Sequence, residues 1–380
     1  MKKILALILA LVMVAALAAC GGGGDTEPSN DSTPAPADVD YSVAMITDYG
    51  DITDQSFNQT TYEACKAFCD EKGVTFKYYK PASDSDEDRI SSIEKAIDDG
   101  FNVIVMPGYA FGPAIKATAE DYEEVTFIAL DVSEFDLGYE GAIPANLYSA
   151  VYQEELCGYM AGYAAVKLGY KKLGFLGGMA VPAVVRYGYG FVQGADAAAA
   201  ELGLTDVAVK YCYGNQFFGD ADITAYMDTW YSNGTEVVFA CGGGIYSSAA
   251  EAAAKYNGKV IGVDVDQAGI IDGTYGEGMT VTSAMKGLAP TVMTMLAAVQ
   301  NGTFEGGRVE NLGLVGTDPE ANYVQLPSAT TQFSDSFTLE DYQALVAAMF
   351  KGEITVSNDI TVAAPSFATV ITVNDLGNLK

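Results

Sequence analysis

Residues 46–59 read I-T-D-Y-G-D-I-T-D-Q-S-F-N-Q and join the two patterns that decide the fold. The run before them, residues 41–46, is mostly apolar and predicts a buried strand. From Ser56 onward, apolar residues recur at helical spacing. In a parallel α/β sheet, ligands bind in the loops that leave the carboxyl ends of the strands. We therefore expect residues 46–59 to carry ligand-binding groups.

Five side chains of this loop suit such a site. Asp48 offers an acceptor at the end of the strand, and Asp54 and Ser56 are both favoured N-caps for the helix that follows. Phe57 presents a flat apolar face, and the amide of Asn58 both donates and accepts hydrogen bonds. Together they suit a heterocycle, held by its face and read at its edge. The alternative is a capped helix with a core phenylalanine and a solvated asparagine.

Short apolar runs alternate with longer helical patterns along the chain, which predicts parallel sheets covered by helices on both faces. The expected strands cover residues 43–47, 75–79, 103–106, 126–130, 173–176, 207–211, 236–240 and 260–263, followed by strand-like stretches over 308–326 and 354–373. The expected helices cover residues 56–72, 87–99, 112–122, 150–167, 184–202, 222–232, 247–256, 289–300 and 339–350. The alternation lapses over residues 138–146, as suits a crossing between two lobes. We predict an α/β protein with two lobes of similar size.

Composition narrows the class of ligand. The 380 residues include 20 Lys and Arg against 50 Asp and Glu, which gives a net charge of −30. A field of this sign repels nucleic acid and disfavours polyanionic substrates such as nucleotides. An uncharged small molecule is therefore the easier ligand, and we expect no nucleic-acid partner.

The complete absence of histidine excludes several enzyme classes. Ser-His-Asp and Cys-His triads and H-E-x-x-H zinc sites all need an imidazole. Most common hydrolytic machinery is thereby excluded.

The amino terminus predicts export. Met1-Lys2-Lys3 is a short basic segment, and residues 4–17 form an apolar stretch too short to span a bilayer comfortably. The string L-A-A-C that ends at Cys20 resembles the bacterial lipoprotein box, in which the cysteine is lipidated. We expect a signal peptide over residues 1–20, a Gly- and Pro-containing tether over 21–40, and a lipid anchor in the cell membrane on its extracytoplasmic face. The alternative is an ordinary secretory signal.

The string T-D-Y-G-D-I-T-D-Q-S-F-N-Q resembles the opening signature of the basic membrane protein family of bacterial lipoproteins, purine nucleoside receptors that serve ABC transporters. Five further strings resemble this family in the same order: F-I-A-L-D (127–131), L-G-F-L-G-G-M-A-V-P (173–182), V-V-F-A-C-G-G-G (237–244), I-G-V-D-V-D-Q (261–267) and T-S-A-M-K (282–286). The likeness covers residues from about 41 to about 302.

The resemblance implies a type I periplasmic-binding-protein-like fold, with a parallel sheet flanked by helices in each lobe and a hinge that the chain crosses three times. On this basis we expect lobe one to comprise residues 41–145 and about 267–325. Lobe two would comprise residues 146–266 and about 326–380.

Two aromatic and two acidic residues are expected to meet in the cleft. Phe217, in Y-G-N-Q-F-F-G-D, is the counterpart of Phe57 in the other lobe, although the adjacent Phe218 is an alternative. Two such rings suit the two faces of a purine. Asp131 and Asp264 each end a strand, one in each lobe. By resemblance, Asp131 joins Asn58 at the purine edge and Asp264 takes ribose hydroxyls.

The remaining expected contacts concern the sugar. Lys286 lies where the family keeps a lysine for the ribose, and its ammonium donates to hydroxyls. Gly243 follows a strand and opens a helix, so its backbone N–H can approach a ligand closely. Asp266 lies two residues after Asp264 and is easily confused with it.

The combined prediction is a lipid-anchored substrate-binding protein of an ABC importer. It would bind a purine nucleoside by closure of two lobes, act as a monomer, and present the closed form to a membrane permease. For such a binding protein we expect no catalytic residues, no metal ligands and no cofactor. Three alternatives remain open: a binding protein for a sugar or another small polar nutrient, an extracytoplasmic nucleoside hydrolase that uses Asp48, Asp131 and Asp264, and a surface sensor or adhesin without a permease.

Overall fold

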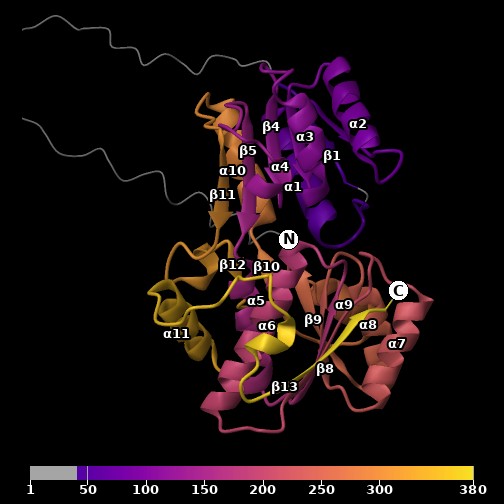
Figure 1. Cartoon of the computed structure of the whole chain (residues 1–380), viewed down its shortest axis with the longest axis vertical. Helices are drawn as coiled ribbons and strands as arrows, with labels where there is room; N and C mark the ends of the chain where they lie inside the picture. Colours follow the sequence, from indigo (N-terminus) through magenta and orange to yellow (C-terminus); the bar gives the residue numbers. More distant parts are fainter. Residues whose placement is uncertain (1–40, 49, 380) are drawn as a thin grey trace, which may run out of the picture. The chain divides into compact units, whose positions relative to one another are not determined.

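The computed structural model describes residues 41–48 and 50–379 (Figure 1). The expected signal peptide over 1–20, the expected lipidation site at Cys20 and the expected tether over 21–40 lie outside the described residues. Among the helices that the structure describes, none has the length and apolar character needed to cross a membrane.

The first sheet has six strands in the order β11-β5-β4-β3-β1-β2, and all neighbours run parallel. Its strands are β1 (Val43–Ile46), β2 (Phe76–Tyr79), β3 (Val103–Pro107), β4 (Thr126–Leu130), β5 (Leu147–Tyr152) and β11 (Arg308–Leu312). The accompanying helices are α1 (Phe57–Lys72), α2 (Asp86–Asp98), η1 (Tyr109–Phe111), α3 (Gly112–Thr118), α4 (Glu134–Leu137) and α10 (Leu288–Gln300).

Both faces of this sheet are covered, which explains why its strands are apolar without alternation. Val43 and Met45 of β1 belong to the buried cluster that includes α1, whereas Ala44 and Ile46 belong to the cluster that includes α2 and α3. Successive side chains of a strand point to opposite faces, so an unbroken apolar run is what a two-sided burial requires.

The second sheet has seven strands in the order β12-β10-β9-β8-β6-β7-β13, and only the short β12 is antiparallel to its neighbour. Its strands are β6 (Lys172–Gly177), β7 (Ala208–Tyr213), β8 (Val237–Cys241), β9 (Lys259–Asp264), β10 (Thr280–Lys286), β12 (Val324–Gln325) and β13 (Thr372–Asn378). The accompanying helices are α5 (Glu154–Lys167), α6 (Pro182–Glu201), α7 (Ala221–Ser232), α8 (Tyr246–Tyr256), α9 (Ala268–Tyr275), η2 (Pro319–Ala321), α11 (Leu339–Phe350) and η3 (Ala364–Phe367).

The chain crosses between the two sheets three times, after β5, after β10, and between β11 and β12. The predicted α/β class, the two parallel lobes and the three crossings are therefore confirmed. The expected boundaries of the lobes, however, need correction.

The first lobe does not end at residue 145, because β5 pairs with β4 and β11 in the first sheet. The lapse over residues 138–146 is a loop inside this lobe. Its last residue, Asn146, donates its side-chain amide to three carbonyl oxygens of the α3–β4 connection at 2.9–3.0 Å. The break in the alternation of strands and helices therefore marks a loop that is held in place within the first lobe. The first crossing between the lobes comes later, after Tyr152.

The return to the first lobe at about residue 267 is also wrong, because β10 pairs with β9 in the second sheet. The chain returns with α10, which packs on α1. The last crossing lies between Leu312 and Val324, close to the expected position at about residue 325. The carboxyl-terminal stretch supplies one strand, β13, where a strand pair over 354–373 was expected.

Glycines bring α5 and α6 into backbone contact. A Cβ atom on Gly158 or Gly162 of α5 would lie 2.1 Å from a carbonyl oxygen of α6, and one on Gly190 or Gly194 of α6 would lie 2.0 Å from a carbonyl oxygen of α5. Only glycine permits this approach. The contact fixes the amino-terminal ends of both helices, which reach the site described next.

Candidate ligand-binding cleft

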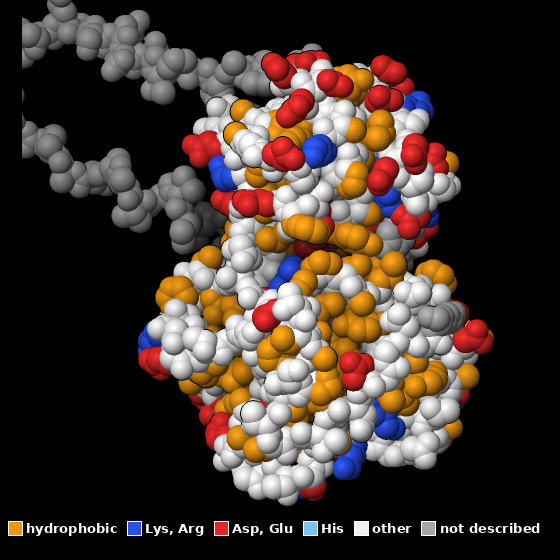
Figure 2. Space-filling view, in the orientation of Figure 1, with side chains coloured by type: hydrophobic (Ala, Val, Ile, Leu, Met, Phe, Trp, Pro, Cys, Tyr) orange, Lys and Arg blue, Asp and Glu red, His pale blue; other side chains and the backbone are white. Residues whose placement is uncertain are grey.

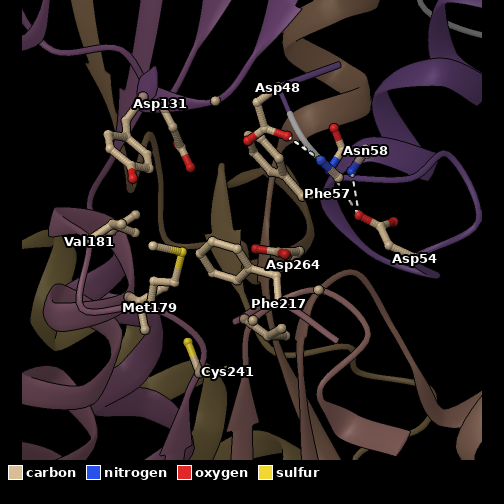
Figure 3. A pocket seen from close by; sticks show the side chains of 18 of the residues that line it. Asp48, Asp54, Phe57, Asn58, Asp131, Met179, Val181, Phe217, Cys241 and Asp264 are labelled. Carbon is tan, nitrogen blue, oxygen red and sulfur yellow. Dashed lines mark hydrogen bonds between the residues drawn. The ribbon is translucent and has the colours of Figure 1, made fainter. Parts of the chain in front are cut away.

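A cavity of about 1000 Å³ lies at the carboxyl ends of the strands of both sheets (Figure 3). Its lining includes all the residues expected to bind a ligand: Asp48, Phe57, Asn58, Asp131, Phe217, Gly243, Asp264 and Lys286. Phe218 lines the cavity as well but is 60% exposed, while Phe217 is half-buried and points into the pocket. Asp266 is absent from the lining, and its carboxylate accepts from Thr330 and from the backbone N–H of Ala268.

Asp54 is the residue that caps α1 and orients Asn58. Its Oδ1 accepts from the backbone N–H groups of Ser56 and Gln59 at 2.9 and 3.0 Å, and its Oδ2 accepts from the backbone N–H of Asn58 at 2.9 Å. The Asn58 side chain donates from Nδ2 to the same Oδ2 at 3.2 Å. The buried Asn58 Oδ1 has no hydrogen-bond partner among the described residues, so it is available as an acceptor.

Glycines from the 173–182 and 237–244 strings pack against Phe217. A Cβ atom on Gly178 would lie 2.4 Å from the Phe217 ring, and one on Gly242 would lie 3.0 Å from it. The backbone N–H of Gly244 donates to the Phe217 carbonyl oxygen at 2.8 Å, and Gly243 has a φ of 52°. The glycine run therefore holds the aromatic loop in place, which is a structural role beside the expected backbone contact with a sugar.

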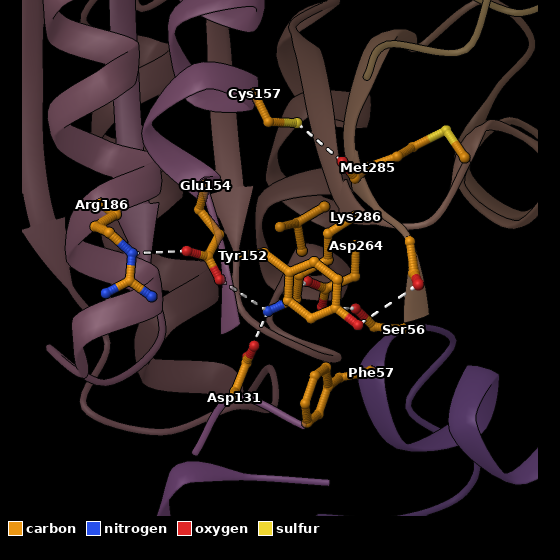
Figure 4. A network of polar contacts seen from close by, with 12 residues as sticks. Ser56, Phe57, Asp131, Tyr152, Glu154, Cys157, Arg186, Asp264, Met285 and Lys286 are labelled. Atoms are coloured by element: carbon orange, nitrogen blue, oxygen red, sulfur yellow. Dashed lines mark hydrogen bonds and ion pairs between the residues drawn. The ribbon is translucent and has the colours of Figure 1, made fainter. Parts of the chain in front are cut away.

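Lys286 lies at the centre of a buried charge network (Figure 4). Its Nζ is 2.5 Å from Asp131 Oδ2, 3.4 Å from Glu154 Oε1 and 3.8 Å from Asp264 Oδ1. The other oxygen of Glu154 accepts from Arg186 Nε at 2.7 Å. The ammonium also lies 4.8 Å from the centre of the Phe57 ring. Lys286 thus has carboxylate partners of its own, in addition to the expected role at the ribose.

Burial and the neighbouring opposite charges shift the pKa values of these groups in opposite directions. Burial alone lowers the pKa of Lys286, but the carboxylates of Asp131, Glu154 and Asp264 outweigh it and raise that pKa. Burial raises the pKa of Asp131 and of Asp264, and Lys286 opposes both shifts. The ammonium therefore stays protonated and keeps the carboxylates together inside the protein.

Asp131 and Asp264 share an unusual backbone conformation. Their φ angles are 60° and 65°, in the left-handed region that non-glycine residues seldom adopt. Asp131 directly follows β4, and Asp264 is the last residue of β9. The two lobes therefore use the same backbone conformation at the carboxyl end of a strand. Such strained residues persist where the surrounding structure holds them, and they concentrate at functional sites.

Sequence reasoning missed Glu154 and Arg186. Glu154 is fully buried and links the two cations of the network, although an acidic residue in the first turn of a helix is ordinary. Arg186 lines the cavity from α6. The sequence offered one weak signal, since Arg186 follows the apolar run Ala183-Val184-Val185 and Glu154 precedes a stretch of apolar and small residues.

Two mostly parallel sheets, joined by three crossings and sharing one cavity with polar and apolar lining, define the two-lobed fold of ABC solute-binding proteins. The fold is similar to a solute-binding protein of an ABC transporter system from Aeropyrum pernix K1, with a TM-score of 0.65, 22% identity, and coverage of 86% of this chain and 90% of that one. A solute-binding protein from Conexibacter woesei DSM 14684 gives a TM-score of 0.64 at 22% identity, covering 84% of this chain and 99% of that one.

Sequence comparison identifies the family. Residues 41–346 match the Bmp family, ABC transporter substrate-binding protein PnrA-like, and the chain belongs to it. The chain is 27% identical over 318 residues to the ABC transporter nucleoside-binding protein BmpA of Lactococcus lactis subsp. cremoris, covering 78% of this chain and 85% of that relative. It is 28% identical over 278 residues to basic membrane protein A1 of Borrelia garinii subsp. bavariensis, covering 72% and 77%. The protein is therefore an ABC transporter substrate-binding protein, as its sequence motifs indicated.

Proposed function

We propose that this protein binds a purine nucleoside between its two lobes and delivers it to an ABC permease, while a lipid on Cys20 holds it at the extracytoplasmic face of the membrane. The observation that carries the proposal is the meeting of Phe57 and Phe217, from opposite lobes, in one cavity. Stacking on aromatic rings contributes about 1–3 kcal/mol per base and suits a flat heterocycle.

Acceptor atoms beside the rings support a ligand with hydrogen-bond donors. Asn58 Oδ1 and Asp131 Oδ1 are buried and have no partner within the described part of the chain. A buried acceptor without a partner costs free energy that a donor can recover. The edge of a nucleobase and the hydroxyls of a ribose provide such donors. Small side-chain movements on binding would bring these donors within hydrogen-bond distance of the two acceptors.

The charges of the lining favour a nucleoside over a nucleotide. The acidic residues of the lining are Asp48, Asp51, Asp54, Asp84, Asp131, Asp136 and Asp264, and the basic ones are Lys80, Arg186 and Lys286. Each of the three cations already lies against a carboxylate. A phosphate would therefore enter an acidic cavity without an unmatched cation to receive it.

The carboxylate arrangement argues against the hydrolase alternative. Asp131, Glu154 and Asp264 surround the Nζ of Lys286, which takes the central position between them. Their charge is thus used to hold an ammonium group, and the site is arranged for binding. By the names they carry, the relatives are also binding proteins.

Calorimetry on protein stripped of copurified ligand tests the proposal. Inosine, guanosine and adenosine are expected to bind, whereas ribose and nucleoside 5′-monophosphates are expected to bind at least tenfold more weakly. Ribose binding as tightly as inosine would favour a sugar-binding protein. Release of free base during incubation with a nucleoside, followed by chromatography, would favour a hydrolase.

The anchor, the oligomeric state and the permease partner are separate parts of the proposal. Labelled palmitate is expected to enter the wild-type protein and to be absent from Cys20→Ser, which should leave the membrane fraction. The purified protein is expected to sediment as a monomer. Its nucleoside-bound form should stimulate the ATPase activity of the ABC permease that it serves.

A further inference from the structure

Ser56 occupies the N-cap position of α1 but does not cap the helix. Its side chain makes no capping hydrogen bond in the described structure, because Asp54 takes the backbone N–H groups at the start of α1. A serine at this position ordinarily accepts from the second or third residue of the helix. The fully buried Ser56 hydroxyl is therefore left for another partner.

That partner is Asp264, on the other sheet. Ser56 Oγ donates to Asp264 Oδ2 at 2.6 Å, between residues 208 positions apart in sequence. The remaining oxygen, Oδ1, lies 3.8 Å from the Nζ of Lys286. The Asp264 carboxylate is thus held at one oxygen by the first lobe and at the other by the charge network.

A second hydrogen bond joins the same two loops. The side-chain Nε2 of Gln267 donates to the Gln55 carbonyl oxygen at 3.0 Å. Gln55 has a φ of 55°, a conformation in which few non-glycine residues occur. Gln267 is itself fixed in the second lobe, because its Oε1 accepts from the Val263 N–H at 3.0 Å and its own N–H donates to Ser283 Oγ at 3.1 Å.

We propose that Ser56 is a positioning residue that acts through Asp264: it orients the carboxylate expected to receive the ligand, and with Gln55 it latches the closed lobes. The role at Asp264 rests on the proposed function. The latch uses protein groups alone, so it favours closure whatever the ligand. Removing it lowers the closed fraction, and the apparent affinity for every ligand falls by the same factor.

Three variants test the inference in the full-length protein. Ser56→Ala removes the hydroxyl, and Ser56→Thr keeps it. Ser85→Ala is the matched control, because Ser85 caps α2 in the ordinary way by accepting from the Asp88 N–H, outside the cleft. The distance between spin labels at exposed positions 98 and 233, one in each lobe, reports closure without any ligand. The native cysteines in the described range are buried and should not react with the label.

We expect unliganded Ser56→Ala to shift toward the longer distance and to lose about tenfold in affinity for inosine, 2′-deoxyinosine and 3′-deoxyinosine alike, as the loss of one hydrogen bond to a charged group implies. Ser56→Thr should resemble the wild type in both measurements. Ser85→Ala should unfold at a lower temperature with unchanged distance and affinity.

An unliganded Ser56→Ala protein with the spin-label distance of the wild type would overturn the latch. An equal loss of nucleoside affinity in Ser56→Thr would also overturn it. A loss for inosine that one of the deoxy ligands escapes would instead show that Ser56 touches the hydroxyl group that this ligand lacks. Should nucleosides fail to bind the wild type, the proposed function fails, and the ligand-free distances still decide whether the latch exists.

Discussion

Phe57 borders both the cavity and a cation, the ammonium of Lys286. Its ring lines the cavity and lies 4.8 Å from the ammonium of Lys286. The same ring is the one on which we propose that a nucleobase stacks, so its proposed contribution combines a cation–π contact with base stacking.

Phe57→Ala should lower nucleoside affinity by about tenfold to a hundredfold, since stacking on one base is worth about 1–3 kcal/mol. Calorimetry with inosine measures the change. Phe350→Ala, which removes a partly exposed ring on α11 outside the cavity lining, should leave the affinity unchanged. Equal affinity in Phe57→Ala and the wild type would exclude stacking at this position.

Glu155 is a buried carboxyl with an unmatched oxygen. Its Oε2 has no hydrogen-bond partner among residues 41–48 and 50–379, and burial raises its pKa from 4.5 to about 7. The folded protein therefore binds this proton more tightly than the unfolded chain does. Stability should fall as the pH rises from about 4.5 to about 7 and remain lower above that range.

Glu155→Gln should remove this dependence. Its gain in unfolding free energy over the wild type should be up to about 3 kcal/mol larger at pH 8 than at pH 4.5, because each unit of pKa difference corresponds to about 1.4 kcal/mol. Urea unfolding at both pH values measures it, with the exposed Glu87→Gln as the control. A pH-independent difference would contradict the assignment.

Individual site residues were predictable from the sequence where their position at the end of an expected strand brings them to the ligand-binding edge of a sheet. Asp131 and Asp264 end apolar runs, and Phe57 follows a loop at a strand end, so the topology brings them to one edge. The partners of Lys286 were not predictable in the same way. Asp131 and Glu154 lie 155 and 132 positions from it, and nothing local in the sequence pairs those charges.

At the scale of elements, the contact between α5 and α6 depends on small residues. Gly190 packs against the carbonyl oxygen of Glu155, which leaves no room for a side chain. These helices carry Glu154 and Arg186 at their amino-terminal ends, so their spacing sets the distance between the two charges.

Gly190→Ala should destabilise the protein by about 1–3 kcal/mol, because its Cβ would lie 2.0 Å from backbone that must move. Gly273→Ala is the matched control: this exposed glycine of α9 has no heavy atom near the position of an added Cβ. It should stabilise by up to about 1 kcal/mol through helix propensity. Chemical unfolding of both variants gives the comparison, and equal effects would contradict the role of the close contact.

Most helices and strands followed from hydrophobic pattern, but β5, β10 and α9 were not expected, and neither was the distribution of strands between the sheets. Residues 147–152 and 280–286 were assigned to the wrong lobes without an expected strand, since strand and helix alternate in the same way on either side of a crossing. Sheet membership depends on which strands pair, and parallel pairing leaves little trace in a single apolar run.

At the scale of the whole molecule, acidic side chains far outnumber basic ones, at 50 against 20. The chain carries a net charge of −30, and acidic side chains are prominent on the face shown in Figure 2. Exposed ion pairs contribute little individually, about 0–1 kcal/mol each, whereas repulsion sums over all unmatched carboxylates.

The melting temperature should therefore rise when NaCl is increased from about 10 mM to about 500 mM, as screening shortens the range of repulsion. The buried network around Lys286 lies largely outside the reach of the salt. Calorimetric scans in NaCl and KCl check the effect, and a melting temperature that falls with either salt would show that the surface ion pairs outweigh the repulsion.

Glu154 follows the first crossing directly, and Lys286 immediately precedes the second. Lys286 lines the cavity, and its ion pair with the buried Glu154 also joins two of the three segments that connect the lobes. An engineer who replaced either one to admit an anionic cargo would change the stiffness of the hinge in the same step. New selectivity is more safely sought on the Phe217 loop and at Met179 and Val181, which line the cavity ahead of α6 and take no part in this charge network.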